Sequence, residues 1–218
     1  MKPLAGPDES LYGGAKVVAL DSFRPRASLS PLRQAEAYWA ALRRDGAVPK
    51  RSAIDPRGLS NLLQYAFILE RVAPGVARFR LAGQHLTQVM GMEVSGLPLT
   101  TLFQSAARQT VSDHLIRLFD DPAIVELALS GQRRFGRNTP TIRMILLPLS
   151  SECGSVDRAL GVLVSEDPTT KEVGKLSIET AHHRVIDVAS EAGWRTGASA
   201  PQRQAERSLF RLVLVSET

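Results

Sequence analysis

The sequence contains little of what a disulfide framework, a membrane span or an exported protein requires. Its 218 residues include a single cysteine, Cys153, which excludes an internal disulfide and any metal centre built from several cysteines. No apolar run reaches the length of about 18 residues that a membrane-spanning helix needs, so we expect no membrane insertion. The first residues lack the apolar stretch of a signal peptide. We therefore expect a cytoplasmic protein.

Recognisable catalytic and cofactor motifs are also missing. The sequence has no Gly-x-x-x-x-Gly-Lys-Ser/Thr, no Gly-x-Gly-x-x-Gly and no Gly-x-Ser-x-Gly. Cys153 could pair with His182 or His183 as a nucleophile and base, but its place in an expected hairpin loop favours an incidental thiol. Glu179, His183 and Asp187 recur every four residues on an expected helix, a spacing that favours an exposed charge ladder over a metal site. We expect no enzyme, no catalytic residue, no bound metal and no cofactor.

The positive charge of the chain is too dispersed to indicate a nucleic-acid partner. The net charge of +5 is spread along the sequence, and its densest cluster, Arg133–Arg137, is short and carries no interleaved aromatic series. A nucleic-acid interface would concentrate Lys and Arg along one element. We expect no nucleic-acid binding.

What the sequence does contain begins with an amphipathic helix over residues 30–45. Ser30 is a suitable N-cap, and Pro31 fits the first helical position. Leu32, Ala35, Trp39 and Leu42 form one apolar stripe, with Arg33, Gln34, Arg43 and Arg44 opposite. We expect this helix to cap a surface, with Trp39 and Arg43 as interaction residues.

A β-hairpin follows, with strands over residues 67–71 and 77–82 joined at Ala73-Pro74-Gly75. A three-residue loop would pair Leu69 with Phe79, Phe67 with Leu81, and Glu70 with Arg78, which keeps apolar side chains on one face. Arg80 alternates with Phe79 and Leu81 and therefore points to the other face. We expect Arg80 to stack on Trp39 or to bind the carbonyl groups that end the first helix.

The remaining elements alternate between short helices and strands. Helices are expected over residues 85–90 and 104–120, with a further helical turn or two at 124–129. The nearly continuous apolar runs 141–149 and 159–165 indicate two buried strands. Residues 178–189 are expected to form a helix, and the β-prone run 209–215 should add to a sheet edge in this chain or in a partner.

Several short motifs between Tyr38 and Asp167 occur in an order and spacing that resemble a known family. These segments are Trp39-Ala40-Ala41-Leu42-Arg43, Val48-Pro49-Lys50-Arg51-Ser52-Ala53-Ile54-Asp55-Pro56, Phe79-Arg80-Leu81-Ala82-Gly83, Gly91 with Gly96, Leu147-Pro148-Leu149-Ser150 and Leu160-Gly161-Val162-Leu163. Through them the chain is similar to a bacterial PAS-domain family, common in alphaproteobacteria, that was first catalogued as a domain of unknown function. It departs from the family at Gln84, where a threonine is usual.

The resemblance implies an α+β fold with a five-stranded antiparallel PAS sheet, helices on one face and an N-terminal capping helix. Its third strand would lie near Gln132–Phe135. The domain organisation is then a mobile tail (1–28), a PAS-like domain (29–170), and a C-terminal helix with a β-prone extension (171–218). His85 and His114 are the two histidines that could serve as a haem ligand in such a domain, although neither carries the surrounding signature.

The function that these observations favour is a non-enzymatic regulatory module that binds an unidentified signalling protein or forms a homodimer through the first helix and a sheet face. The alternative is a sensor for a small apolar ligand held between the sheet and the helices. The side chains expected to line such a cavity are Phe67, Leu69, Phe79, Leu81, Met90, Leu115 and Phe119.

Overall fold

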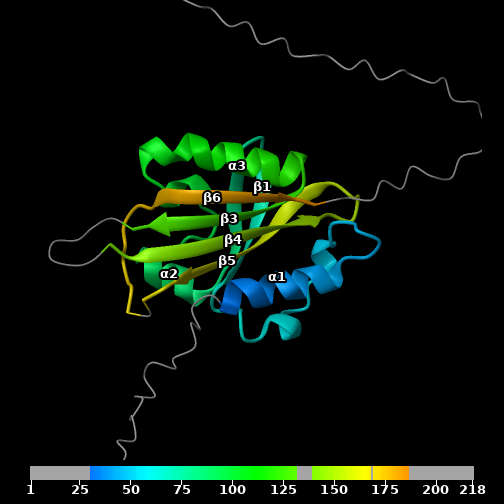
Figure 1. Cartoon of the computed structure of the whole chain (residues 1–218), viewed down its shortest axis with the longest axis horizontal. Helices are drawn as coiled ribbons and strands as arrows, with labels where there is room; N and C mark the ends of the chain where they lie inside the picture. Colours follow the sequence, from blue (N-terminus) through cyan, green and yellow to red (C-terminus); the bar gives the residue numbers. More distant parts are fainter. Residues whose placement is uncertain (1–29, 132–138, 168, 187–218) are drawn as a thin grey trace, which may run out of the picture. The chain divides into compact units, whose positions relative to one another are not determined.

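The computed structural model describes residues 30–131, 139–167 and 169–186 (Figure 1). Its elements are α1 (Ser30–Leu42), the short 3-10 helices η3 (Arg51–Ala53) and η4 (Pro56–Leu59), β1 (Ala66–Ala73), β2 (Val76–Ala82), α2 (Gln84–Met90), η5 (Leu99–Leu102), η6 (Ser105–Ala107), α3 (Arg108–Asp120), β3 (Ala123–Ser130), β4 (Thr141–Ser150), β5 (Val156–Ser165) and β6 (Ser177–Val185). No helix within the described ranges is long and apolar enough to cross a membrane.

The strands form one antiparallel sheet in the order β2-β1-β5-β4-β3-β6. The expected α+β class with an antiparallel sheet is confirmed, but the described residues form six strands rather than five. The nearly continuous apolar runs at β4 and β5 lie at the centre of the sheet, where both faces are covered.

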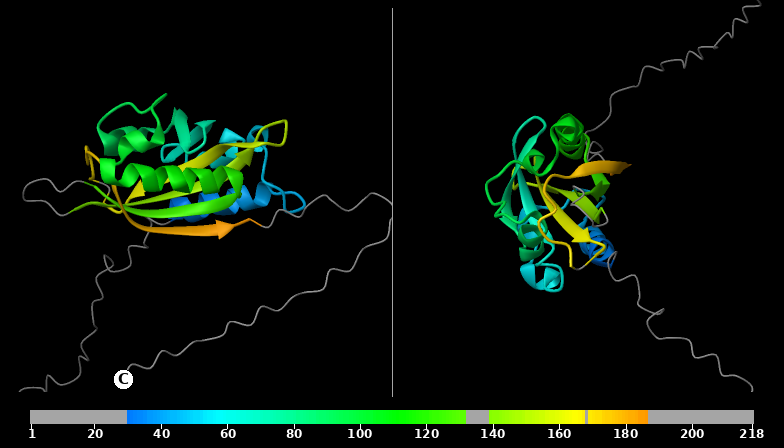
Figure 2. Two further views of the ribbon diagram at one scale, coloured as in Figure 1. Left: turned by 90° about the horizontal axis from the view of Figure 1, so that it is seen from above. Right: turned by 90° about the vertical axis from the view of Figure 1, so that its left-hand side faces the viewer.

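The sheet separates two apolar cores. We call the side covered by α2, η5 and α3 the inner face, and the side covered by α1 the outer face (Figure 2). Helix α1 contacts β4 and β5, and its stripe residues Leu32, Ala35 and Trp39 are buried there. The expected capping role of this helix is therefore confirmed, and its apolar stripe is used within the chain.

The β1–β2 hairpin has the expected central register, but it reaches that register differently. Leu69 pairs with Phe79 and Glu70 with Arg78, as predicted. The loop is nevertheless the two-residue Pro74-Gly75, since Ala73 pairs with Val76, and an irregularity between Arg71 and Ala73 supplies the missing residue. Gly75 has the positive φ that such a tight turn requires.

Two segments expected to be helical are strands. Residues 124–129 belong to β3, and the expected third strand near 132–135 falls on residues outside the described ranges. Residues 177–185 form β6 rather than the start of a helix, because β6 pairs along β3. The expected domain boundary at residue 170 is therefore wrong, since β6 belongs to the same sheet. Residues 1–28 and the run 209–215 also lie outside the described residues.

Candidate functional site

The inner face gathers six of the seven side chains expected to line a ligand cavity. Five of them belong to strands β1 and β2 or to helix α3, and the sixth is Met90, the last residue of α2. All six are buried within one continuous apolar cluster: Phe67, Leu69, Phe79, Met90, Leu115 and Phe119. These six side chains therefore lie together between the sheet and the helices, in one buried apolar core.

Leu81 is the exception, and the prediction that it lines the space between the sheet and the helices was wrong. A bulge lies between Ile68 and Leu69, so that Ile68 pairs with Leu81 and Phe67 with Ala82. The bulge places Arg80 and Leu81 together opposite Ile68, which turns Leu81 to the outer face and leaves it 57% exposed. Strict alternation along β2 cannot reveal such an inserted residue.

The Phe67 ring has room on the inner face because β5 has a glycine opposite it. Phe67 pairs with Gly161, and a Cβ on Gly161 would lie 2.1 Å from the phenyl ring. The same ring meets Phe79 edge-on, with centroids 5.3 Å apart. Gly161 therefore provides the space that lets Phe67 lie flat against the sheet.

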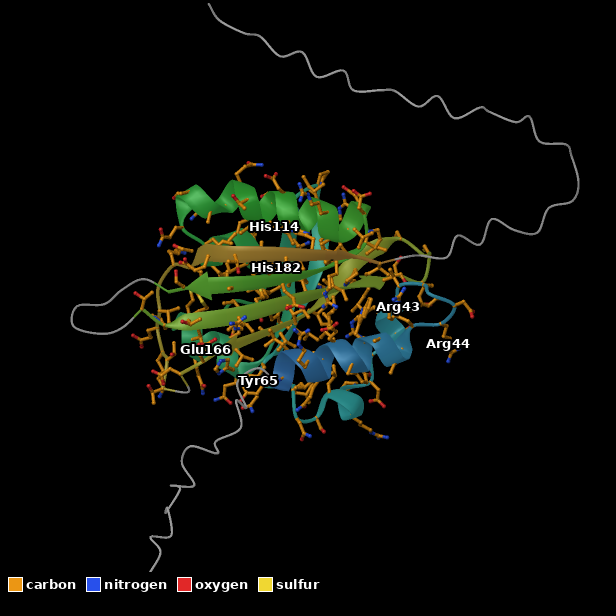
Figure 3. The ribbon with its side chains drawn as sticks, in the orientation of Figure 1. Arg43, Arg44, Tyr65, His114, Glu166 and His182 are labelled. Atoms are coloured by element: carbon orange, nitrogen blue, oxygen red, sulfur yellow. The ribbon has the colours of Figure 1, made fainter. Side chains whose placement is uncertain are left out.

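Trp39 and Arg43 act together at the end of α1 rather than at an exposed interface. The Trp39 indole is buried on the outer face, and its Nε1–H donates to the carbonyl of Pro148 on β4 at 2.7 Å. The Arg43 guanidinium lies 5.4 Å from the Trp39 ring centroid and donates to the carbonyls of Gly46 and Ala47. Figure 3 shows Arg43 near the end of α1. Arg43 thus has the role that the sequence suggested for Arg80.

Arg80 belongs instead to a cluster on the outer face of the hairpin. Its Nε lies 3.2 Å from Glu70 Oε2, and Arg78 Nε lies 3.6 Å from the same oxygen. Arg158 on β5 contacts Glu70 Oε1 at 2.8 Å through Nη2. Glu70 pairs across the sheet with both Arg78 and Arg158, so one carboxylate lies among three guanidinium groups. We call these four residues the arginine corner.

Strand β6 is held to the rest of the sheet by polar contacts on both faces. On the outer face, Arg184 lies 2.6 Å from Glu36 of α1 and 2.7 Å from Glu126 of β3. Arg33 of α1 contacts the same two carboxylates, which closes a ring of four charged residues. The hydrogen bond from Arg184 is the largest influence on the Glu36 carboxyl and lowers its pKa.

On the inner face, His183 of β6 meets His114 of α3. The two imidazoles share a hydrogen bond of 2.8 Å between His183 Nε2 and His114 Nδ1, so one ring donates and the other accepts. Their remaining ring nitrogens are buried without a partner among the described residues. Burial lowers the pKa of both rings, and Arg117 lowers it further for each, while His183 adds to the effect on His114.

The residues that the sequence offered as haem ligands, as a nucleophile with its base, or as metal ligands lie in different parts of the structure. Of the two histidines that could serve as a haem ligand, His85 accepts a hydrogen bond from the backbone N–H of Ser165 at its Nε2, over 3.3 Å, and His114 shares its Nδ1 with His183. Cys153 is exposed in the β4–β5 loop, whereas His183 faces the inner core. Glu179 binds Ser130 on the outer face, and Asp187 lies outside the described residues. Within the described ranges, no three potential metal ligands gather.

Sequence reasoning missed the His114–His183 pair and the contacts of Arg184. The residues concerned are far apart in the chain, and β6 was expected to be a helix. Only the correct assignment of β6 as the strand next to β3 would have brought them together.

Comparison with known proteins identifies the fold family. A family model described as a PAS domain matches residues 27–164, which is more than half of the chain. No curated protein matches. Solved structures also match, and three of them are light-oxygen-voltage (LOV) domains or proteins. A light-oxygen-voltage domain studied with a flavin analogue is 20% identical, with a TM-score of 0.39 over 51% of this chain and 84% of its own.

The second structure, a LOV protein of Rhodobacter sphaeroides, is 13% identical, with a TM-score of 0.38 over 63% of this chain and 69% of its own. The third is the light state of the Aureochrome1 LOV domain, 14% identical with a TM-score of 0.37 over 51% and 88%. Nothing about a ligand of this chain follows from them. The family match, together with the antiparallel sheet covered by helices, shows that the chain belongs to the PAS domain family.

Proposed function

We propose that this PAS domain is a non-enzymatic regulatory module that passes on its signal by binding a protein at the free edge of β6, with a second copy of the chain as the first partner to test. The first helix is a poor candidate for the contact. Its apolar stripe, with Leu32, Ala35 and Trp39, is buried on the sheet of the same chain. Dimerisation through that stripe would require α1 to leave its own domain.

The observation that carries the proposal is the position of β6 in the sheet. β6 is the last strand in the order, and it runs for nine residues, 177–185, with mostly exposed side chains. Among the described residues, no strand pairs with its outer edge. An edge strand of this kind offers backbone N–H and C=O groups to an added strand. Val185 is 78% exposed at its end and adds an apolar contact.

The test is to place charges along this edge while leaving the core unchanged. Thr180 and Val185 are both exposed, so Thr180→Lys/Val185→Lys should preserve the melting temperature while opposing strand addition. Ser60→Lys/Asn61→Lys adds the same charge at exposed positions beyond η4 and serves as the control. We expect wild type and control to self-associate in light scattering, and the edge variant to stay monomeric.

Equal association of all three proteins would contradict the proposal. So would a wild type that remains monomeric at the highest attainable concentration and forms no cross-link from a photoreactive group at His182, which is exposed on β6.

The second candidate function is a sensor for a small apolar ligand on the inner face. It is supported by the single apolar cluster that Phe67, Leu115 and Phe119 share with the side chains of α2. Native mass spectrometry of the purified protein tests it. A ligand mass that is lost in Leu115→Phe, which fills the cluster, would favour this function. A ligand-free protein whose melting temperature does not change when apolar metabolites are added would contradict it.

A further inference from the structure

The arginine corner presents more positive charge than the chain neutralises there. Three guanidinium groups, of Arg78, Arg80 and Arg158, surround the single carboxylate of Glu70. Arg158 has a second acidic neighbour in Asp157, at 3.1 Å. The arginine corner and Asp157 together therefore have a net charge of +1, with three cations against two anions. Arg78 and Arg80 have no other ion pair within the described ranges.

The charge that remains is accessible from the solvent. The side chains of Arg78 and Arg80 are 47% and 58% exposed, whereas Glu70 is largely covered beneath them. Both arginines contact Glu70 through Nε, and neither guanidinium forms an ion pair with any other residue in the part of the chain that the structure describes. Guanidinium groups in this arrangement bind carboxylates well, because two parallel N–H donors match the two carboxylate oxygens.

An apolar side chain lies beside these cations. The bulge in β2 puts Leu81 next to Arg80 on the outer face, with more than half of its surface in water. The outer edge of β2 is occupied, since Phe79 bonds Leu97 and Gly96 through the backbone. A partner at this corner must consequently lie across the face of the hairpin and use side chains rather than add a strand.

We propose that the arginine corner docks an acidic segment of a partner protein, whose carboxylates bind Arg78 and Arg80 and whose apolar side chain covers Leu81. A mixed surface of this kind favours an acidic peptide with apolar residues over a nucleic acid, since the excess charge is small and no described aromatic side chain offers a stacking surface there. The site goes beyond the proposed function, which concerns the opposite edge of the sheet at β6.

The test uses the full chain and a short fluorescent peptide of glutamate and leucine residues. We expect anisotropy to show binding that weakens with salt, and Arg78→Gln/Arg80→Gln to weaken it about tenfold. Leu81→Ser should weaken it by a smaller factor. Arg143→Gln is the matched control, because Arg143 is a similarly exposed strand arginine with one acidic partner, Glu166. Its affinity should stay near that of wild type.

Three results would overturn the proposal. The first is the absence of peptide binding to wild type, and the second is equal binding by the corner variant. The third is that another molecule binds as tightly as the acidic peptide, or more tightly, through the same arginines. That molecule could be a peptide with glutamine in place of glutamate, or a single-stranded oligonucleotide with the same charge as the acidic peptide. The peptide assay does not involve β6, so light scattering of the Thr180→Lys/Val185→Lys variant reports separately on the proposed function.

Discussion

The two edges of the sheet differ: within the described residues the β2 edge is covered by the chain, and the β6 edge is free. At the β2 edge, the chain returns along the strand, and Arg78 forms a bridge with Pro98 while Phe79 bonds Leu97 and Gly96. Ala77 and Phe79 on the same strand are buried. At the β6 edge, the strand is mostly exposed and is fastened by His183 on one face and Arg184 on the other.

This difference suggests that the β2 edge has a structural role and that the β6 edge is available to a partner. Burial of apolar side chains contributes most of the stability of a fold, whereas exposed ion pairs contribute about 1 kcal/mol or less each. The β2 edge and its inner-face contacts should therefore decide whether the domain folds. The β6 edge should respond to pH, salt and partners without unfolding the domain. Substitutions on the two sides can test that division.

The largest effect is expected on the β1–β2 side, from Gly161→Ala. The added Cβ would lie 2.1 Å from the buried Phe67 ring, which must move within a packed core. We expect a loss of about 3 kcal/mol in the free energy of unfolding, measured by urea titration. Phe67→Leu should restore part of it in the double variant, because the two residues are in contact. Additive losses would show that Phe67 does not depend on Gly161.

A smaller effect is expected where α1 contacts the centre of the sheet. Trp39→Phe keeps an aromatic ring but removes the N–H that donates to Pro148 across 2.7 Å. An unpaired buried carbonyl and a small void should cost about 2 kcal/mol by the same titration. Arg44→Gln is exposed on the same helix end and should change stability little. Similar losses in both variants would contradict the role assigned to Trp39.

On the β6 side, Arg184→Gln should cost about 1 kcal/mol or less, although it removes two ion pairs. Since the side chains of the two arginines in this ring of four charged residues, Arg33 and Arg184, are 68% and 48% exposed, the loss should shrink as salt is added. A loss as large as that of Gly161→Ala, or one that is independent of salt, would remove the distinction between the two edges.

The smallest effect is expected from pH. His114 and His183 have a lowered pKa in the fold, so below about 6.5 the unfolded chain binds protons that the folded chain does not. Stability should be constant above that pH and fall as the pH decreases towards the folded pKa values. His183→Gln should flatten the decrease seen in thermal melts between about pH 6.5 and 5. His85 also has a lowered pKa through burial and will leave a residual slope.

The parts of the fold that the sequence predicts are those with one apolar face. The register of Leu69 with Phe79 follows from alternation, and the helix over 84–90 and the end of α3 at Asp120 follow from apolar spacing and a proline stop. Leu81 shows the limit of this reasoning, since one bulge residue changes the face of the next side chain.

Strand β6 could not be predicted by the same means. Ile178, Ala181 and Val185 lie three and four residues apart, which fits a helix, yet the irregularity opposite Ala128 and Leu129 gives a strand the same spacing. Its contacts depend on polar residues distant in sequence, such as His114. The candidate site at the β6 edge therefore required the structure, whereas the core of the inner face did not.

Hydrogen exchange of the native protein at low and high concentration tests the central claim most directly. If partners bind at the free edge of β6, those backbone amides of residues 177–185 that point away from β3 should exchange quickly in dilute protein and become protected on association. The amides of β2 should be equally protected in both conditions. Protection that appears in α1 or the β1–β2 hairpin, with β6 unchanged, would contradict the account.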